Sequence, residues 1–266
     1  MTLGREALRA ALSTHAGTPA GILIGEGVGV VGLCAGLGGN QLRTPLSEAG
    51  SVGVALGLAL AGRAPVVEII DLAGVNRAAE ALAEAADLAR RSGGAFRAPI
   101  VVVATLPDGG VIPTLPEGVS LAVAGVPEDA AGLLTAALAG GGPVVLLLAE
   151  AALDERGEGP VEPLGVPMVR RAGAGSTVLA EGAGVSLALA VATDAEVIDL
   201  RGCRDPARLG ALFGRTGRVV LFGHGIEPLV AALGESFWRL ETRPVFVPVT
   251  AGADALRAAL TDSFSP

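Results

Sequence analysis

Short apolar runs rich in β-branched residues alternate with helix-like segments along this chain, and this alternation restricts the fold more than any other feature. In the first half the runs are GILIG (21–25), PVVEII (65–70), APIVVVAT (98–105), VSLAVAG (119–125) and PVVLLLA (143–149). Buried strands that alternate with helices form a mostly parallel sheet with helices on both faces. The sequence therefore predicts an α/β fold.

The segments between these runs carry signals for helix ends. A helix over 47–62 has Ser47 as its N-cap, and a second helix is expected to begin after Asn76 and to stop at Gly93. In PEDAAGLLTAALAGGGP, Pro127 occupies the first helical position, acids fill the first turn and glycines follow the end. These signals place helices on the connections between the strands.

Residues 154–172 are rich in Pro, Gly and charge, and we predict them to be a linker between two domains. The first domain would span 1–153, and a smaller second α/β domain would span 173–266. The strands expected in the second domain are STVLA (176–180), AEVIDL (195–200), RVVLFG (218–223) and PVFVPV (244–249), with helices near 206–213, 226–240 and 253–261.

The composition excludes several classes of partner. Hydrophobic residues make up 51% of the 266 residues, yet no uninterrupted apolar run reaches the roughly 18 residues of a membrane span. The apolar surface is therefore expected to form subunit contacts. A net charge of −8 argues against nucleic acid or an anionic membrane. Only two cysteines, Cys34 and Cys203, and no zinc-like cluster indicate a reducing cytoplasm.

The stretch Gly27-Val-Gly29-Val-Val-Gly32 satisfies the G-x-G-x-x-G pattern of dinucleotide-binding folds and follows a predicted strand. The residues after it, VVGLCAGLGGN, are too rich in glycine to favour a helix. A dinucleotide site needs a helix N-terminus there to bind the phosphates. The pattern alone therefore does not support a nicotinamide or flavin site.

A single acid, Glu48, lies at the start of a helix that is otherwise built from small and apolar residues, in RTPLSEAGSVGVALGLALAG (43–62). An unpaired buried carboxylate costs several kcal/mol, or its pKa rises until it is neutral. Glu48 therefore either serves a function or bonds the backbone N–H groups of the first helical turn. Gly53, Gly57 and Ala61 share one face of this helix and would allow a close approach, either to another subunit or to the sheet.

This stretch resembles the beta subunit of the thiamine-diphosphate-dependent, decarboxylating first component of 2-oxo acid dehydrogenases, a family related to transketolase. The similar blocks, in the order of the family, are REAL near the start, IGEGVGV, TPLSEAGSVGVALGLALAGRAPVVEI, RRSGGAFRAPIVVVA, PEDAAGLLTAAL before GGGPVVLL, and AEVIDLR. The resemblance implies a pyrimidine-binding domain followed by a domain like the C-terminal domain of transketolase.

The resemblance also implies roles for two acids. Glu48 would bond the ring nitrogen of the cofactor's aminopyrimidine and share a proton with it, for which the carboxylate should be dry and have a shifted pKa. Glu26, in IGEGVGV, would be a second carboxylate near the cofactor.

Two family features are missing. Family members carry a His-Ser-Gln segment in the connection that corresponds to 105–118, but that connection contains no histidine here, and His15 and His224 lie elsewhere. An aromatic residue that stacks on the aminopyrimidine is replaced, at about Gly74, by a residue without a side chain.

The chain also lacks the GDG…N motif that holds magnesium and the diphosphate. In two-gene members that motif belongs to an alpha subunit, so the resemblance implies an alpha-type partner that holds the magnesium, self-association to a dimer, and no metal ligand in this chain. Two hypotheses remain. The chain is the beta-type subunit of a thiamine-diphosphate enzyme that acts on a 2-oxo acid or a ketose, or it is a non-catalytic paralogue that keeps the fold and interface as a structural or regulatory partner.

Overall fold

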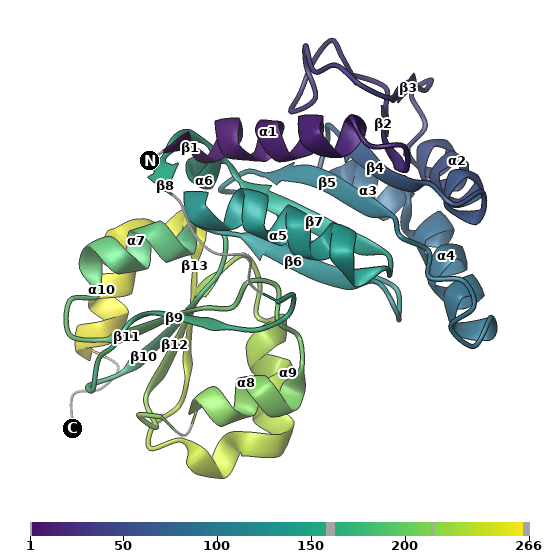
Figure 1. Cartoon of the computed structure of the whole chain (residues 1–266). Coiled ribbons are helices and arrows are strands. Elements are labelled where there is room, and N and C mark those ends of the chain that lie inside the picture. Colours follow the sequence, from purple (N-terminus) through teal and green to yellow (C-terminus); the bar gives the residue numbers. More distant parts are fainter. Residues whose placement is uncertain (1, 158–162, 214, 263–266) are drawn as a thin grey trace.

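Six parallel strands form the first sheet of the computed structural model, which describes residues 2–157, 163–213 and 215–262 (Figure 1). The strand order is β3-β2-β4-β5-β7-β6. The strands are β2 (Gly21–Gly25), β3 (Gln41–Arg43), β4 (Ala64–Ile69), β5 (Val101–Leu106), β6 (Ser120–Ala124) and β7 (Val144–Ala149). The α/β fold predicted from the alternation of apolar runs is confirmed.

Helices cover both faces of this sheet. One face packs against α1 (Gly4–Ala16), α5 (Pro127–Gly140) and α6 (Glu150–Asp154), and the other against α2 (Glu48–Leu60), α3 (Ala73–Arg77) and α4 (Ala79–Arg91). Side chains alternate between the two cores, because neighbours on a strand point to opposite faces: Val101 and Val103 lie in the first core, and Val102 lies in the second.

The second sheet has five strands in the order β13-β12-β10-β11-β9, and only β9 is antiparallel to its neighbour. The strands are β9 (Met168–Arg171), β10 (Thr177–Ala180), β11 (Glu196–Asp199), β12 (Val219–Gly223) and β13 (Val245–Pro248). One face packs against α7 (Gly184–Val191) and α10 (Gly252–Asp262), and the other against α8 (Pro206–Phe213) and α9 (Glu227–Ser236). The 3-10 turns η1 (Phe237–Arg239) and η2 (Val249–Ala251) complete this part.

Three elements differ from the sequence prediction. Asn76 is not an N-cap, because α3 already begins at Ala73 and α4 follows it after a break at Ala78. The segment predicted as linker ends in β9, which joins the second sheet, while 158–162 lie outside the described residues. The N-terminal residues form β1 (Thr2–Leu3), which pairs with β8 (Arg156–Gly157). No described helix is long and apolar enough to cross a membrane.

The second domain docks on the edge strand β6 of the first sheet. The N–H of Val123 donates to the carbonyl of Arg201 at 3.3 Å. A Cβ at Gly202 would lie 2.7 Å from the carbonyl oxygen of Leu121, and Gly202 has a φ of +87°, so only glycine suits this approach. The docking therefore gives the edge strand a backbone partner.

Four buried charged side chains join the two domains beside this contact. Asp129 comes from the first turn of α5, whereas Arg170, Asp199 and Arg201 come from the second domain. Arg170 pairs with Asp129 and lies 2.9 Å from Asp199, and Arg201 Nε lies 3.3 Å from Asp129. Burying these charges is tolerated because each has an opposite charge within reach.

The two aspartates of this group do not titrate normally. Burial raises the pKa of Asp199 to about 7 although Arg170 lies beside it, and burial also raises the pKa of Asp129. Both carboxyl groups accept hydrogen bonds from Arg170. With a pKa of about 7, Asp199 takes up a proton near neutral pH.

This proton makes the stability of the chain depend on pH. The folded pKa of Asp199 exceeds the unfolded value of about 3.9, so its stabilising contribution is full below that value and is lost as the pH rises towards 7. We expect Asp199→Asn to flatten the loss of urea-unfolding midpoint between about pH 4 and 7, since Asn does not titrate in that window. Asp154→Asn, which removes only an exposed pair with Arg5, is the control. Parallel profiles for the wild type and both variants would contradict the raised pKa of Asp199.

Candidate functional site

Glu48 is placed by a tightly bonded turn at the start of α2. Ser47 is the N-cap, as predicted, and its hydroxyl accepts the N–H of Gly50 at 3.1 Å. The hydroxyls of Thr44 and Ser51 lie 2.7 Å apart and tie the entering chain to the first turn of the helix. Glu48 is thereby fixed as the first helical residue, where the partial positive charge of the helix end stabilises an anion.

Three carboxylates meet at the carboxyl ends of neighbouring strands. Glu26 follows β2, Glu68 lies near the end of β4, and Glu48 follows β3. All three line one hollow together with the hydroxyl-bearing Ser47 and Ser51. The carboxyl edge of a parallel sheet is where ligands bind in such folds. The structure therefore brings the two predicted site residues, Glu48 and Glu26, to one place.

The hollow is small in the chain alone. Its volume of about 10 Å³ is close to the minimum for a single water molecule. No ring fits in this space as it stands.

The Glu48 side chain is only 15% exposed, but its carboxylate is paired with an arginine. Its Oε1 lies 2.5 Å from Arg77 Nη2, and the same guanidinium group bonds Asp71 at 3.1 Å. The hydrogen bond from Arg77 is the main cause that lowers the pKa of Glu48 below its usual range. Glu48 is therefore held as an anion. Sequence reasoning missed Arg77, for which the sequence gives no distinct signal.

Glu68 was also missed, although a lone acid in the apolar strand PVVEII is a visible signal. It is buried, and its carboxylate accepts the backbone N–H groups of Leu33 and Cys34, the latter at 3.2 Å. Burial raises the pKa of Glu68, and these two N–H groups oppose that rise. The Glu68 carboxylate therefore provides the hydrogen-bond acceptors for the backbone of this loop, as a neighbouring strand would in a sheet.

The loop over 26–40 contains the glycine pattern that resembles a dinucleotide site, and it contains no helix. Besides Glu68, it is held by Arg9 of α1, whose guanidinium donates to the carbonyls of Leu33 and Ala35 at 2.6 Å each. Without a helix N-terminus after Gly32, the loop does not offer the phosphate site that the pattern requires. Its first residue, Glu26, lines the hollow.

Neither histidine lines the hollow. His15 Nε2 lies 2.7 Å from the carbonyl of Ala64. His224 Nδ1 lies 2.9 Å from the carbonyl of Gly110 in the shortened connection, while its Nε2 is buried next to Gly182 without a hydrogen-bond partner among the described residues. His224 therefore binds the two domains together rather than facing Glu48.

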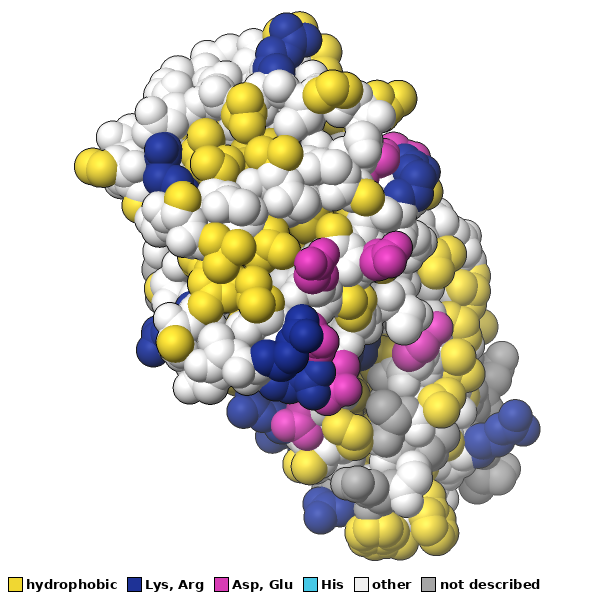
Figure 2. Space-filling model, turned by 90° about the vertical axis from the view of Figure 1, so that its right-hand side faces the viewer, with side chains coloured by type: hydrophobic (Ala, Val, Ile, Leu, Met, Phe, Trp, Pro, Cys, Tyr) yellow, Lys and Arg dark blue, Asp and Glu magenta, His cyan; other side chains and the backbone are white. Residues whose placement is uncertain are grey.

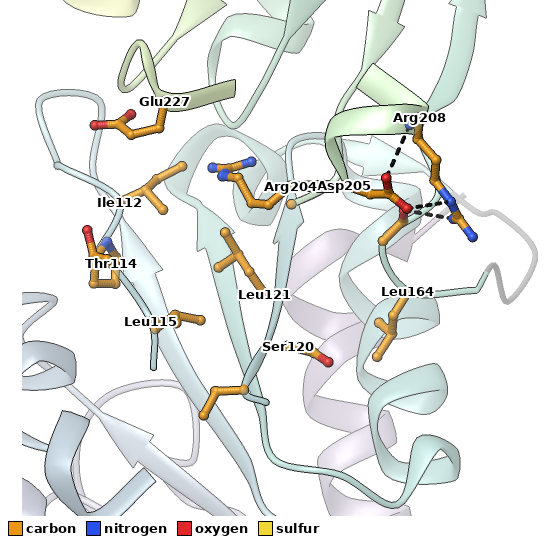
Figure 3. A pocket seen from close by; sticks show the side chains of 14 residues that line it. Ile112, Thr114, Leu115, Ser120, Leu121, Leu164, Arg204, Asp205, Arg208 and Glu227 are labelled. Carbon is orange, nitrogen blue, oxygen red and sulfur yellow. Dashed lines mark hydrogen bonds and ion pairs between the residues drawn. The ribbon is translucent and has the colours of Figure 1, made fainter. Parts of the chain in front are cut away.

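A larger cavity, of about 540 Å³, lies between the two domains and contains none of the predicted site residues (Figure 3). Its apolar wall includes Ile112, Leu115 and Leu121 of the first domain. On the other side lie Arg204, which forms a two-pronged bond with the buried Glu181, and the exposed acid Glu227. We keep the small hollow as the candidate site because the carboxylates converge there.

Solved structures with the same fold are transketolase-like. A chain described as "Split gene transketolase, inactive beta4 tetramer" superposes with a TM-score of 0.71 at 19% identity, over 98% of this chain and 97% of that one. Transketolase from Campylobacter jejuni superposes with a TM-score of 0.68 at 15% identity, over 96% of this chain and 46% of its own. The chain has a transketolase-like fold.

Sequence relatives narrow this class. The pyruvate dehydrogenase E1 component subunit beta of Leifsonia xyli is 31% identical over 76% of this chain and 70% of its own length. The 3-methyl-2-oxobutanoate dehydrogenase subunit beta of Mycobacterium tuberculosis is 32% identical over 74% of this chain and 66% of its own length. The 2-oxoisovalerate dehydrogenase subunit beta of Pseudomonas aeruginosa is 34% identical over 66% and 62%. No family model matches.

The chain belongs to the family of beta subunits of 2-oxo acid dehydrogenase E1 components, and the resemblance read from its motifs is confirmed. It spans between 62% and 70% of the length of these relatives.

The support that Glu68 gives the loop can be tested at two glycines. Gly32 and Gly36 have φ values of +79° and +66°, so alanine at either costs about 1 kcal/mol of unfolding free energy. A Cβ at Gly32 would collide with the Glu68 carboxylate, whereas a Cβ at Gly36 would have no other atom within 4 Å. We expect Gly32→Ala to lower the free energy of unfolding by about 1–3 kcal/mol more than Gly36→Ala, because it breaks the hydrogen bonds that Glu68 accepts. Equal losses in urea unfolding would contradict this role.

Proposed function

We propose that this chain is the beta-type subunit of a two-chain thiamine-diphosphate enzyme that acts on a 2-oxo acid. The observation that carries the proposal is the position of Glu48, which is the first residue of α2 and lines a hollow at the carboxyl edge of the sheet. Its relatives named as pyruvate and branched-chain 2-oxo acid dehydrogenase subunits support this substrate class, and a ketose is the other substrate that the fold allows.

The donor set of the hollow suits an aminopyrimidine, although the room does not. Glu48 would bond the ring nitrogen, and Glu26 would be the second carboxylate beside the cofactor. Glu68 is already used by the loop and would act as a support. When bound, thiamine diphosphate supplies a carbon nucleophile that attacks the 2-oxo carbon. The contribution of this chain would be to orient the ring and to hold a proton at Glu48 Oε1 or Oε2.

Specific observations favour a second candidate, a non-catalytic paralogue that keeps the fold as a structural or regulatory partner. Glu48 is paired with Arg77, position 74 offers no side chain, and no histidine lines the hollow. A catalytic and a structural subunit differ in whether Glu48 matters for turnover, which a single substitution can decide.

The partners that we propose are an alpha-type chain and a second copy of this chain. The alpha-type chain would hold the diphosphate and the magnesium, because this sequence contains no GDG…N motif. The solved structure of which this chain covers 97% is described as an inactive beta4 tetramer. That description favours self-association here. A reducing cytoplasm suits Cys34 and Cys203, which are free and buried.

The outer face of α2 is the surface that we propose for subunit contact. Beyond Glu48 this helix has no charged residue, and its outward side chains include Val54 and Leu60, which are 41% and 57% exposed. A Cβ at Gly53 or Gly57 would meet no other atom, so the small-residue stripe faces away from the sheet. Figure 2, which views this side of the molecule, shows apolar side chains over much of the first domain. Such a face is typical of an interface.

The catalytic role of Glu48 is tested in the complex with the alpha-type chain. We expect Glu48→Gln to reduce turnover by about 10²- to 10⁴-fold, because an amide cannot share a proton with the ring. Its melting temperature should stay nearly unchanged. Ser92→Ala is the matched control, since it removes a hydroxyl that accepts the N–H of Phe96 at 3.0 Å outside the hollow, and it should cost about 1 kcal/mol and about 2–4 °C while leaving turnover in place. Activity that survives in Glu48→Gln would favour the non-catalytic candidate.

The proposed interface is tested by sedimentation of the purified chain. We expect a dimer or larger species, and we expect Val54→Asp to shift it towards monomer by placing a charge in the contact. Val111→Asp introduces the same charge at a valine that is 72% exposed on the connection after β5, and should leave the assembly unchanged. A monomeric wild-type chain would overturn the proposed self-association.

A further inference from the structure

Arg77 and Gly74 together determine where the Glu48 side chain lies. Arg77 is the last residue of α3, its side chain is 51% exposed, and it reaches Glu48 and Asp71. A Cβ at Gly74 would lie 2.8 Å from Glu48 Oε1 and 2.9 Å from Glu48 Cγ. The Glu48 side chain therefore rests on the bare backbone of Gly74, in space that any larger residue would occupy.

The same carboxylate lines the small hollow. Glu48 contacts Gly74 and pairs with Arg77, and neither Gly74 nor Arg77 lines the hollow. Glu26 and Glu68 bring two further acids to the hollow, and neither forms an ion pair within the part of the chain that the structure describes. The nearest positive charge that Glu48 meets is therefore Arg77, which stabilises this position of the carboxylate.

We propose that Arg77 is a positioning residue that latches the Glu48 carboxylate over Gly74, and that this ion pair must open before Glu48 can serve a pyrimidine ring. The proposal rests on the proposed cofactor role of Glu48 and adds the contact that controls it. The latch is displaceable, because exposed ion pairs are weak and are screened by salt.

The charge state of Glu48 agrees with the latch. Arg77 lowers the pKa of Glu48, whereas sharing a proton with a weakly basic ring nitrogen requires a carboxyl group whose pKa is not depressed. The other charged groups near this region are Asp71 on the α3 side, Glu26 and Glu68 in the hollow, and Arg9 of α1, whose charge acts on Glu68. Because the hydrogen bond from Arg77 is the largest cause of the lowered pKa of Glu48, loss of Arg77 would let that pKa rise.

The pairing is measured first, in the purified chain without cofactor, by NMR titration of the Glu48 carboxyl carbon. We expect the Glu48 midpoint to lie below the usual glutamate range in the wild type, to stay low in Arg77→Lys, and to rise in Arg77→Gln. Arg90→Gln, which removes the exposed pair with Asp87 on α4, is the matched control and should leave Glu48 unchanged. A Glu48 midpoint that ignores Arg77→Gln would overturn the latch.

The consequence is measured second, by calorimetric titration of the alpha–beta complex with thiamine diphosphate and Mg²⁺. Opening an exposed pair that favours the closed position should tighten the apparent Kd by up to about 5-fold in Arg77→Gln. High salt should narrow the difference between wild type and variant. Unchanged or weaker binding in Arg77→Gln would overturn the latch, since it would mean that Arg77 does not oppose the ligand.

The two measurements separate failure of the latch from failure of the proposed function. If the Glu48 midpoint responds to Arg77 but neither complex binds thiamine diphosphate, the cofactor role is overturned and the ion pair stands as a feature of a non-catalytic subunit. If both complexes bind equally and the midpoint does not respond, the latch is overturned and the cofactor role remains.

Discussion

The buried group formed by Asp129, Arg170, Asp199 and Arg201 is the interaction on which the arrangement of the two domains depends. Arg170 and Asp199 already pair within the second domain, whereas, among the described residues, Asp129 and Arg201 meet an opposite charge only across the junction. The backbone contact between Val123 and Arg201 lies beside this group, so the edge strand and the charges are satisfied together. The domains are therefore joined by buried ion pairs as well as by a backbone hydrogen bond.

A second buried carboxylate organises the candidate site in a similar way. Glu68 uses its oxygens to bond the backbone of the glycine-rich loop, and Arg9 holds the same loop through its carbonyl groups. These bonds fix the loop next to the hollow, which Glu26, the first residue of the loop, lines. Two acids of the hollow therefore have different roles: Glu68 bonds the backbone of the loop, whereas Glu48 lies at the start of α2 and bonds no part of that loop.

Much of this could be predicted from the sequence, for physical reasons. Strands such as Gly21–Gly25 and the helix that begins at Pro127 follow from apolar runs and end signals, which are local. Asn76 misled the prediction because α3 is a short helix stabilised by its neighbours, not by a cap. The Glu48–Arg77 pair joins residues 29 positions apart, and a surface arginine looks the same whether it is paired or solvated. Such contacts depend on the tertiary fold.

The charge state of Glu48 determines whether its carboxyl group can share a proton with a ligand. Two influences stabilise its anion, the backbone N–H at the start of α2 and the guanidinium of Arg77, and desolvation opposes them. A partner chain that covered the hollow would exclude water and increase the desolvation, but the paired arginine would still favour the charged form. Covering the site is therefore not sufficient to make Glu48 a proton-sharing group. If Glu48 serves a cofactor as proposed, the position of Arg77 matters as much as the presence of the carboxylate.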